Sequence, residues 1–172
     1  MEPRLKPGTA SPILEFETLS AGQWSLDRTR PKALDLIAVY RGLFCPYCRG
    51  FISDLARRSK ALNERGIDPV IVSMDDAERA RKASAEWDLG EITVGFGLTL
   101  EAARRWNVFI TQREQDNRLT TFCEPAVFLV RPDKRLFAML LQSIPSGRPD
   151  LDNLLQGIDY LAEHGYPIRG AA

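Results

Sequence analysis

Apolar residues recur along the first half of the chain in the order expected for a strand, a helix and a second strand. Residues 33–40, ALDLIAVY, form an apolar run of strand length, suited to a sheet that is buried on both faces. From 51 to 64 the apolar positions have helical spacing, and Gly66 is placed to end that helix in a left-handed conformation. Residues 68–74 fit the next strand. Together these elements predict a right-handed βαβ unit with parallel strands.

The middle of the chain has weaker patterns. A second helix is expected from Asp75 or Asp76, because Asp75 and Glu78 have the spacing of a capping box. A short strand is expected at 91–97. Residues 107–122 have no clear period, and we interpret them as an exposed insertion.

The end of the chain predicts an antiparallel hairpin followed by a helix. Residues 126–130 and 136–142 flank a turn in which Pro132 fits the second position of type I. A final helix is expected to begin near Asp150 and to end before Gly165. The order βαβ, helix, insertion, ββα predicts an α/β protein of one domain over residues 1–172, with a central mixed sheet flanked by helices.

Composition and charge exclude several classes of function. The 172 residues are 44% hydrophobic and 27% charged, as in an ordinary globular protein, and 23 basic residues balance 23 acidic ones. No basic field suggests nucleic-acid binding, and no apolar run is long enough to span a membrane. Residues 1–11 are polar and proline-rich and lack the apolar stretch of a secretory signal. We therefore expect a flexible or loosely attached tail and, with only three cysteines, a cytoplasmic protein.

The strongest chemical signal is FCPYCRG, residues 44–50, in which a proline and a tyrosine separate two cysteines. Cys45 lies between the end of a predicted strand and the first turn of a helix, where free N–H groups and the helix dipole favour a thiolate. Cys48 follows one turn later and is placed to attack a mixed disulfide formed at Cys45. Arg41 and Arg49 either add positive potential to the pair or are solvated surface charges.

The cysteine pair has two plainer interpretations. A structural zinc site usually takes four ligands, and beyond the pair the chain offers only Cys123 and the distant His164. Two inert core thiols are the other alternative, because free cysteine is often buried as a small hydrophobic residue. Strand end, helix start and close spacing together favour a redox centre, which needs no metal or other cofactor.

Several separate segments follow one another in the order of a known family. They are VYRGLFCPYCRGFISDL, GFGLTLEAARRWNV, CEPAVFLVRPDKRL and SIPSGRPDLDNLL. Over about residues 12–169 the chain resembles the peroxiredoxin-like branch of the alkyl hydroperoxide reductase/thiol-specific antioxidant family, and CPYC is also the glutaredoxin active-site motif. The resemblance implies a thioredoxin-like fold and thiol-based antioxidant or disulfide-reductase chemistry, with Cys45 and Cys48 as the redox pair.

The same resemblance implies a cis-proline at Glu124-Pro125, opening the strand that faces the active-site helix. Such a loop would form a substrate groove whose free backbone pairs with an extended peptide. A trans-proline that simply starts a strand is the alternative. Cys123, two residues before the proline, is either a third redox thiol beside Cys45 or an incidental small residue.

The chain departs from the peroxide pocket of that family. Peroxiredoxins typically carry a threonine three residues before the peroxidatic cysteine and a proline four before that. Counted back from Cys45, these positions hold Gly42 and Ala38, and counted back from Cys48 they hold Cys45 and Arg41. We therefore expect a thiol–disulfide oxidoreductase, with a thiol peroxidase and a non-catalytic binding module as alternatives.

The expected partners follow from that chemistry. The substrates are disulfides or hydroperoxides, and the reductant is a small thiol or a thioredoxin- or glutaredoxin-type protein. The balanced charge and the hydropathy pattern predict no nucleic-acid or membrane partner. They leave the oligomeric state open.

Overall fold

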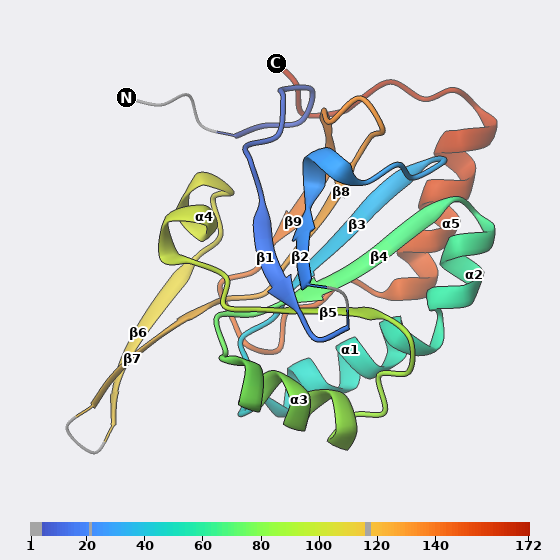
Figure 1. Ribbon diagram of the computed structural model, residues 1–172. Helices are drawn as coiled ribbons and strands as arrows, with labels where there is room; N and C mark the ends of the chain where they lie inside the picture. Colours follow the sequence, from blue (N-terminus) through green and yellow to red (C-terminus); the bar gives the residue numbers. More distant parts are fainter. Residues whose placement is uncertain (1–4, 21, 116–117) are drawn as a thin grey trace.

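A computed structural model describes residues 5–20, 22–115 and 118–172 of the protein (Figure 1). The strands are β1 (Glu15–Thr18), β2 (Gly22–Ser25), β3 (Leu34–Val39), β4 (Ile67–Val72), β5 (Thr93–Phe96), β6 (Ile110–Gln115), β7 (Arg118–Cys123), β8 (Ala126–Val130) and β9 (Leu136–Leu141). The helices are α1 (Pro46–Arg57), α2 (Ser59–Glu64), α3 (Ala77–Glu86), α4 (Leu100–Arg105) and α5 (Leu151–Glu163), with a short 3₁₀ turn, η1 (Leu26–Arg28).

The main sheet is mixed and has the strand order β2-β1-β5-β4-β3-β8-β9. Strands β3, β4 and β5 are parallel, whereas β8 and β9 form an antiparallel hairpin next to β3. The predicted βαβ unit, the C-terminal hairpin and the mixed sheet flanked by helices are therefore confirmed. Parallel strands β3 and β4 are mostly buried, as their near-continuous apolar runs require.

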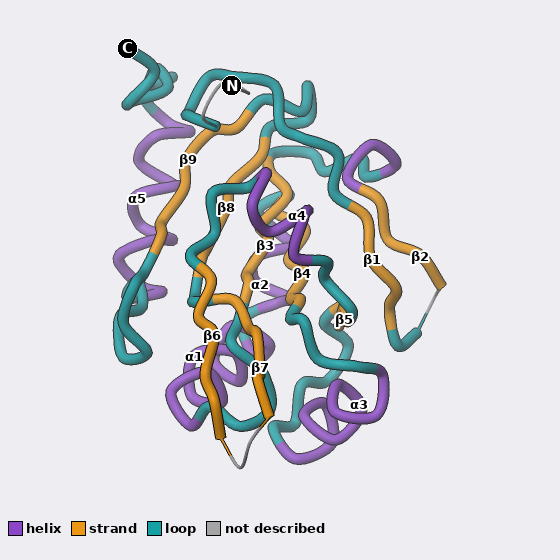
Figure 2. Tube along the Cα trace, turned by 90° about the vertical axis from the view of Figure 1, so that its left-hand side faces the viewer, coloured by secondary structure: helices purple, strands orange, loops and turns teal. Residues whose placement is uncertain are grey.

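Each face of the sheet has its own core. On one face, α1, α2, α3 and α5 contribute to a first core cluster that contains Cys45 and Cys48. On the other face, α4 and the N-terminal segment contribute to a second core cluster that contains Trp106, Cys123 and Phe128. Figure 2 shows α4 in front of the sheet and α1 and α2 behind it. The three cysteines are thus divided between the two faces.

The N-terminal tail differs from expectation. Residues 5–11 are attached to the protein, because Gly8 N donates to Leu136 O (2.8 Å) and Ser11 N donates to Lys134 O (2.9 Å). Leu5 is buried in the second core cluster. The segment was expected to be a loose tail because of its polar composition. It is instead held by backbone hydrogen bonds to the start of β9 and by the buried side chain of Leu5. Residues 1–4 of that predicted tail lie outside the described residues.

The expected insertion at 107–122 is a β-hairpin formed by β6 and β7, and its tip, 116–117, lies outside the described residues. Figure 1 shows it projecting from the body of the protein. Most of its described side chains on β6 are exposed, so neither strand has the apolar alternation by which a strand is recognised. Strands β1 and β2, which lie at one end of the strand order and have four residues each, were also not predicted.

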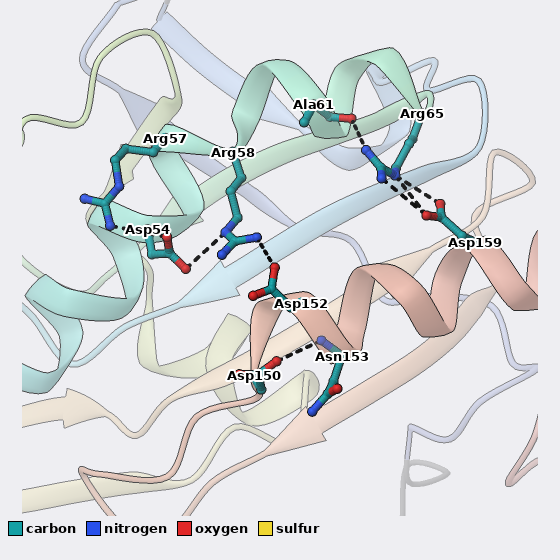
Figure 3. A network of polar contacts seen from close by, with 9 residues as sticks. All are labelled: Asp54, Arg57, Arg58, Ala61, Arg65, Asp150, Asp152, Asn153 and Asp159. Atoms are coloured by element: carbon teal, nitrogen blue, oxygen red, sulfur yellow. Dashed lines mark hydrogen bonds and ion pairs between the residues drawn. The ribbon is translucent and has the colours of Figure 1, made fainter.

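Helix α5 is fixed against α2 by ion pairs that span the two elements (Figure 3). Arg58 pairs with Asp152, and Arg65 pairs with Asp159 at 3.0 Å. Helix α5 begins next to Asp150, as the sequence predicted, and Asp150 caps it by accepting a hydrogen bond from Asn153 N at 2.8 Å. Because these ion pairs are exposed to solvent, they contribute little to stability. Their geometric effect is to fix the start of α5 and the end of the loop before it.

Candidate active site

Cys45 is the N-cap of α1, at the position where the sequence predicted it. Its backbone is extended (φ −97°, ψ 109°), and its Sγ accepts a hydrogen bond from the backbone N–H of Cys48 at 3.3 Å. Pro46 is the first residue of the helix, where its missing N–H costs nothing. The sulfur therefore takes the place of the oxygen of a usual capping side chain, at the positive end of a twelve-residue helix.

The loop that presents Cys45 is shaped by a glycine and a carboxylate. Gly42 has φ +135°, and a Cβ at this residue would lie 2.9 Å from Oδ1 of Asp75. The other carboxylate oxygen of Asp75 accepts a hydrogen bond from Leu43 N at 2.7 Å. Gly42 O in turn accepts a hydrogen bond from Cys45 N at 3.1 Å. Any other residue at position 42 would be strained, because its φ is positive and because its Cβ would contact the Asp75 carboxylate too closely.

Arg41 lies beside the Cys45 sulfur, with Nη1 at 3.7 Å from Sγ. Its Nε forms an ion pair with Oε2 of Glu124 at 3.2 Å, and Glu124 also accepts a hydrogen bond from Thr111 Oγ1 at 2.7 Å. The guanidinium carbon lies 5.2 Å and 4.8 Å from the ring centroids of Phe44 and Phe122. The charge is therefore held beside the thiol by a buried carboxylate and two aromatic rings.

The two thiols of the pair are strongly unequal. The pKa of Cys45 is lowered to about 5, first by a hydrogen bond from the Cys48 thiol and then by Cys48 N–H and Arg41, against the opposing effect of burial. The pKa of Cys48 is raised, because its thiol donates to Cys45 and because it is buried. At neutral pH the pair therefore holds one thiolate, at Cys45, and one thiol, at Cys48.

The sulfur of Cys48 has two further donors. Arg41 N lies 3.4 Å from Cys48 Sγ, and Nη2 of Arg148 lies 3.0 Å from it. Arg148 belongs to the loop between β9 and α5 and is separated from Cys48 by 100 positions. Sequence reasoning did not identify this contact. No local spacing could have revealed it, because the fold alone brings the two segments together.

Other predicted site residues lie elsewhere. The Arg49 guanidinium donates to Glu86 O (3.3 Å), at the end of α3, rather than to either sulfur. Cys123 is fully buried in the second core cluster, where burial and the Glu124 charge raise its pKa to about 12.

The cis-proline expectation is wrong. No peptide bond among the described residues is cis, so Glu124–Pro125 is trans. Glu124 N donates to Phe109 O (2.7 Å), and Pro125 O accepts from Gln142 N (3.0 Å). The alternative interpretation, a trans-proline directly before a strand, is therefore the correct one.

A cavity of about 550 Å³ lies next to the site. It is lined by Arg41, Phe44, the start of α3 and the β6–β7 hairpin. Cys45 itself is only 1% exposed, whereas its neighbours Phe44 and Tyr47 are 40% and 56% exposed. Approach to the thiolate therefore requires these side chains or Arg41 to move. Within the described residues, no group of three histidine, cysteine or acidic side chains could hold a metal ion.

A family comparison adds to this geometry. The model of the AhpC/TSA family matches residues 7–139, which is more than half of the chain. The chain belongs to the AhpC/TSA family. It is accordingly an oxidoreductase of peroxiredoxin-like type, as the sequence predicted, and the described part of this AhpC/TSA protein contains no helix that could cross a membrane.

Solved structures agree in fold at low sequence identity. A mutant of peroxiredoxin 6 of Arenicola marina is 17% identical, with a TM-score of 0.80 over 92% of this chain and 74% of that chain. The reduced 2-Cys peroxiredoxin of Plasmodium vivax is 20% identical, with a TM-score of 0.74 over 96% and 100%. A candidate thiol:disulfide interchange protein, DsbE, of Chlorobium tepidum is 18% identical, with a TM-score of 0.69 over 92% and 98%. No curated protein gives a significant sequence match.

Proposed function

We propose that this AhpC/TSA protein is a thiol–disulfide oxidoreductase with an antioxidant role, and that Cys45 and Cys48 form its dithiol/disulfide centre. The observation that carries the proposal is the inequality of the two thiols at the start of α1. Cys45 has its pKa lowered to about 5, and Cys48 stays protonated within hydrogen-bond reach of it. A nucleophile and a resolving thiol are the two parts that disulfide exchange requires.

The reaction has two steps. The Cys45 thiolate attacks one sulfur of a disulfide RSSR′, forms a mixed disulfide with RS, and releases R′S⁻. Cys48 then loses its proton to R′S⁻ and attacks Cys45 Sγ, which expels RS⁻ and leaves a Cys45–Cys48 disulfide. The substrate is reduced by two electrons and the protein is oxidised by two. A small thiol or a thioredoxin- or glutaredoxin-type protein restores the dithiol, in a reducing compartment such as the cytoplasm.

The cavity beside Arg41 suits a small substrate. Its volume of about 550 Å³ lies within the range of small-molecule sites. Arg41 lines this cavity and lies 3.7 Å from Cys45 Sγ, so its movement would open a path from the cavity to the thiolate.

A thiol peroxidase is the second candidate, and the Arg41 contact favours it. A guanidinium 3.7 Å from Cys45 Sγ offers donors to a peroxide oxygen. Cys45 would attack ROOH, release ROH and become a sulfenic acid, which Cys48 would condense to the disulfide with loss of water. The position of the family threonine is Gly42, however, which offers no hydroxyl to such a substrate.

Stopped-flow reaction of the reduced protein with hydrogen peroxide and with hydroxyethyl disulfide distinguishes these functions. We expect the disulfide to react faster, and both reactions to disappear in Cys45→Ser. A peroxide rate far above the disulfide rate would make the protein a peroxidase. Failure to react with either, together with an ordinary thiol pKa, would instead indicate a binding module.

A further inference from the structure

Arg148 is the described charged side chain that touches the resolving thiol. Cys48 is fully buried, and its sulfur accepts a hydrogen bond from Nη2 of Arg148 at 3.0 Å. Within the described residues no carboxylate lies within ion-pair distance of this arginine. Arg41, by contrast, is neutralised by Glu124. The positive charge of Arg148 is therefore directed at a sulfur rather than at an acidic partner.

The loop between β9 and α5 holds this guanidinium in place. Nη1 of Arg148 donates to Pro145 O at 2.8 Å and to Gly147 O at 2.7 Å, and its guanidinium carbon lies 6.0 Å from the ring centroid of Phe51. The loop leads directly into the Asp150 cap of α5, whose ion pairs to α1 and α2 appear in Figure 3. A cation held by two carbonyls of its own loop, beside the capped start of α5, needs little reorganisation to act on Cys48.

The second step of exchange needs such a charge. In the resting protein the Cys48 thiol donates to the Cys45 thiolate, which disfavours its own ionisation. Once Cys45 is in a mixed disulfide, that anion is gone, but Cys48 remains buried and must become a thiolate to react. The donors that remain at its sulfur are Arg148 and the backbone N–H of Arg41. The neighbouring Tyr40, with a pKa raised to about 12 mainly by burial, stays neutral.

We propose that Arg148 is a catalytic residue of the resolving step: it stabilises the Cys48 thiolate that attacks the mixed disulfide at Cys45. This inference rests on the exchange function proposed above. The proton of Cys48 passes to the first released thiolate, R′S⁻. The Cys48–Cys45 bond then forms while the Cys45–SR bond breaks, and RS⁻ leaves with the electron pair and takes a proton from solvent. Arg148 stays protonated throughout and neither gains nor loses electrons.

Stopped-flow reaction of the reduced protein with 4,4′-dithiodipyridine separates the two steps. The probe is neutral, so Arg148 has no charge on it to attract, and each step releases one coloured thiopyridone. We expect Arg148→Gln to release the first equivalent at the wild-type rate and the second about 10- to 100-fold more slowly, which is the effect of losing one hydrogen bond to a charged group. Arg148→Lys should recover part of the rate, because it restores the charge without the fixed fork.

Arg131→Gln is the matched control, because Arg131 also lies over a phenylalanine ring, at 5.2 Å from Phe137, in a turn far from the thiols along the chain. It should release both equivalents at wild-type rates. Measuring the second-phase rate of Arg148→Gln as a function of pH distinguishes loss of thiolate stabilisation from a loosened loop. If Arg148 stabilises the thiolate, the second phase of Arg148→Gln should accelerate with pH and approach the wild-type rate in alkali.

The possible results distinguish failure of the role of Arg148 from failure of the proposed disulfide-exchange function. If the wild type releases no second equivalent and forms no Cys45–Cys48 disulfide, the exchange function fails. If the wild type releases both equivalents and Arg148→Gln keeps the wild-type second phase, only the role of Arg148 fails. An equal loss in Arg148→Gln at every pH would likewise overturn it, because the arginine would then only shape the loop.

Discussion

The carboxylate of Glu124 and the guanidinium of Arg41 form a buried ion pair of 3.2 Å that joins the ends of two neighbouring strands. Val39 at the end of β3 is paired with Ala126 at the start of β8. Because β3 and β8 are antiparallel, Arg41, two residues after Val39, lies beside Glu124, two residues before Ala126. The pairing of β3 with β8 thus positions the Arg41 guanidinium at the active site.

The first prediction concerns the stability of that ion pair. Arg41→Met should lower the free energy of unfolding by about 3 kcal/mol, because it leaves the buried Glu124 carboxylate without its partner. The double variant Arg41→Met/Glu124→Gln should regain most of this loss, since no charge is then left uncompensated. Urea unfolding of the reduced proteins measures both values. A double variant as unstable as the single one would mean that Arg41 acts through packing and not through the pair.

The second prediction concerns the nucleophile. The rate of iodoacetamide labelling of reduced Cys45 should follow a titration with a midpoint at pH about 5, well below that of a free thiol. Cys48→Ala should move the midpoint upward, because the hydrogen bond from the Cys48 thiol is the largest cause of the low pKa. Cys48→Ser should move it less, since a hydroxyl still donates. Mass spectrometry after brief labelling identifies the modified residue, and preferential labelling of Cys48 would reverse the assignment.

The third prediction links the same pKa to stability. Cys45 has a folded-state pKa of about 5, below that of the unfolded thiol, so the unfolded state binds more protons between these two values. The stability of the reduced protein relative to Cys45→Ala should therefore rise from pH 5 to about pH 8.5, the ordinary thiol pKa. It should be lost as pH falls through 5. Above that window the pKa of Cys48, which is raised first by its hydrogen bond to Cys45, acts in the opposite direction. Denaturant midpoints measured across pH would test this, and a constant difference would contradict a stabilised thiolate.

The elements that the sequence predicted well are those specified by local pattern. The βαβ unit, the hairpin around Pro132 and the start of α5 near Asp150 are each visible as continuous segments with strand or helix spacing, bounded by turn residues. The position of Cys45 at the start of α1 belongs to the same class, because strand end, proline and helical period are adjacent in the chain. The β6–β7 hairpin was not predicted, because residues 107–122 have no clear strand period and the pairing of the two strands is visible only in the fold.

The contacts that tune the thiols are of a different kind. Arg148 reaches Cys48 across 100 positions, and Arg41 meets Glu124 only because β3 and β8 are neighbours. Sequence reasoning gave Arg41 and Arg49 equal standing, yet α1 turns Arg49 toward Glu86. Such choices depend on strand order and loop path, which the local spacing of residues does not encode.

The last prediction concerns which thiol resolves Cys45. Cys48 lies in the first core cluster with Cys45, whereas Cys123 is fully buried in the second cluster, where its pKa is raised to about 12. A protonated thiol in the other core is a poor nucleophile toward a mixed disulfide at Cys45. Cys48→Ser should therefore accumulate mixed disulfides on Cys45, while Cys123→Ala should keep most of the disulfide-reductase turnover. Peptide mapping of the oxidised wild-type protein measures the linkage directly, and a dominant bond to Cys123 would replace the two-cysteine mechanism by a three-cysteine relay.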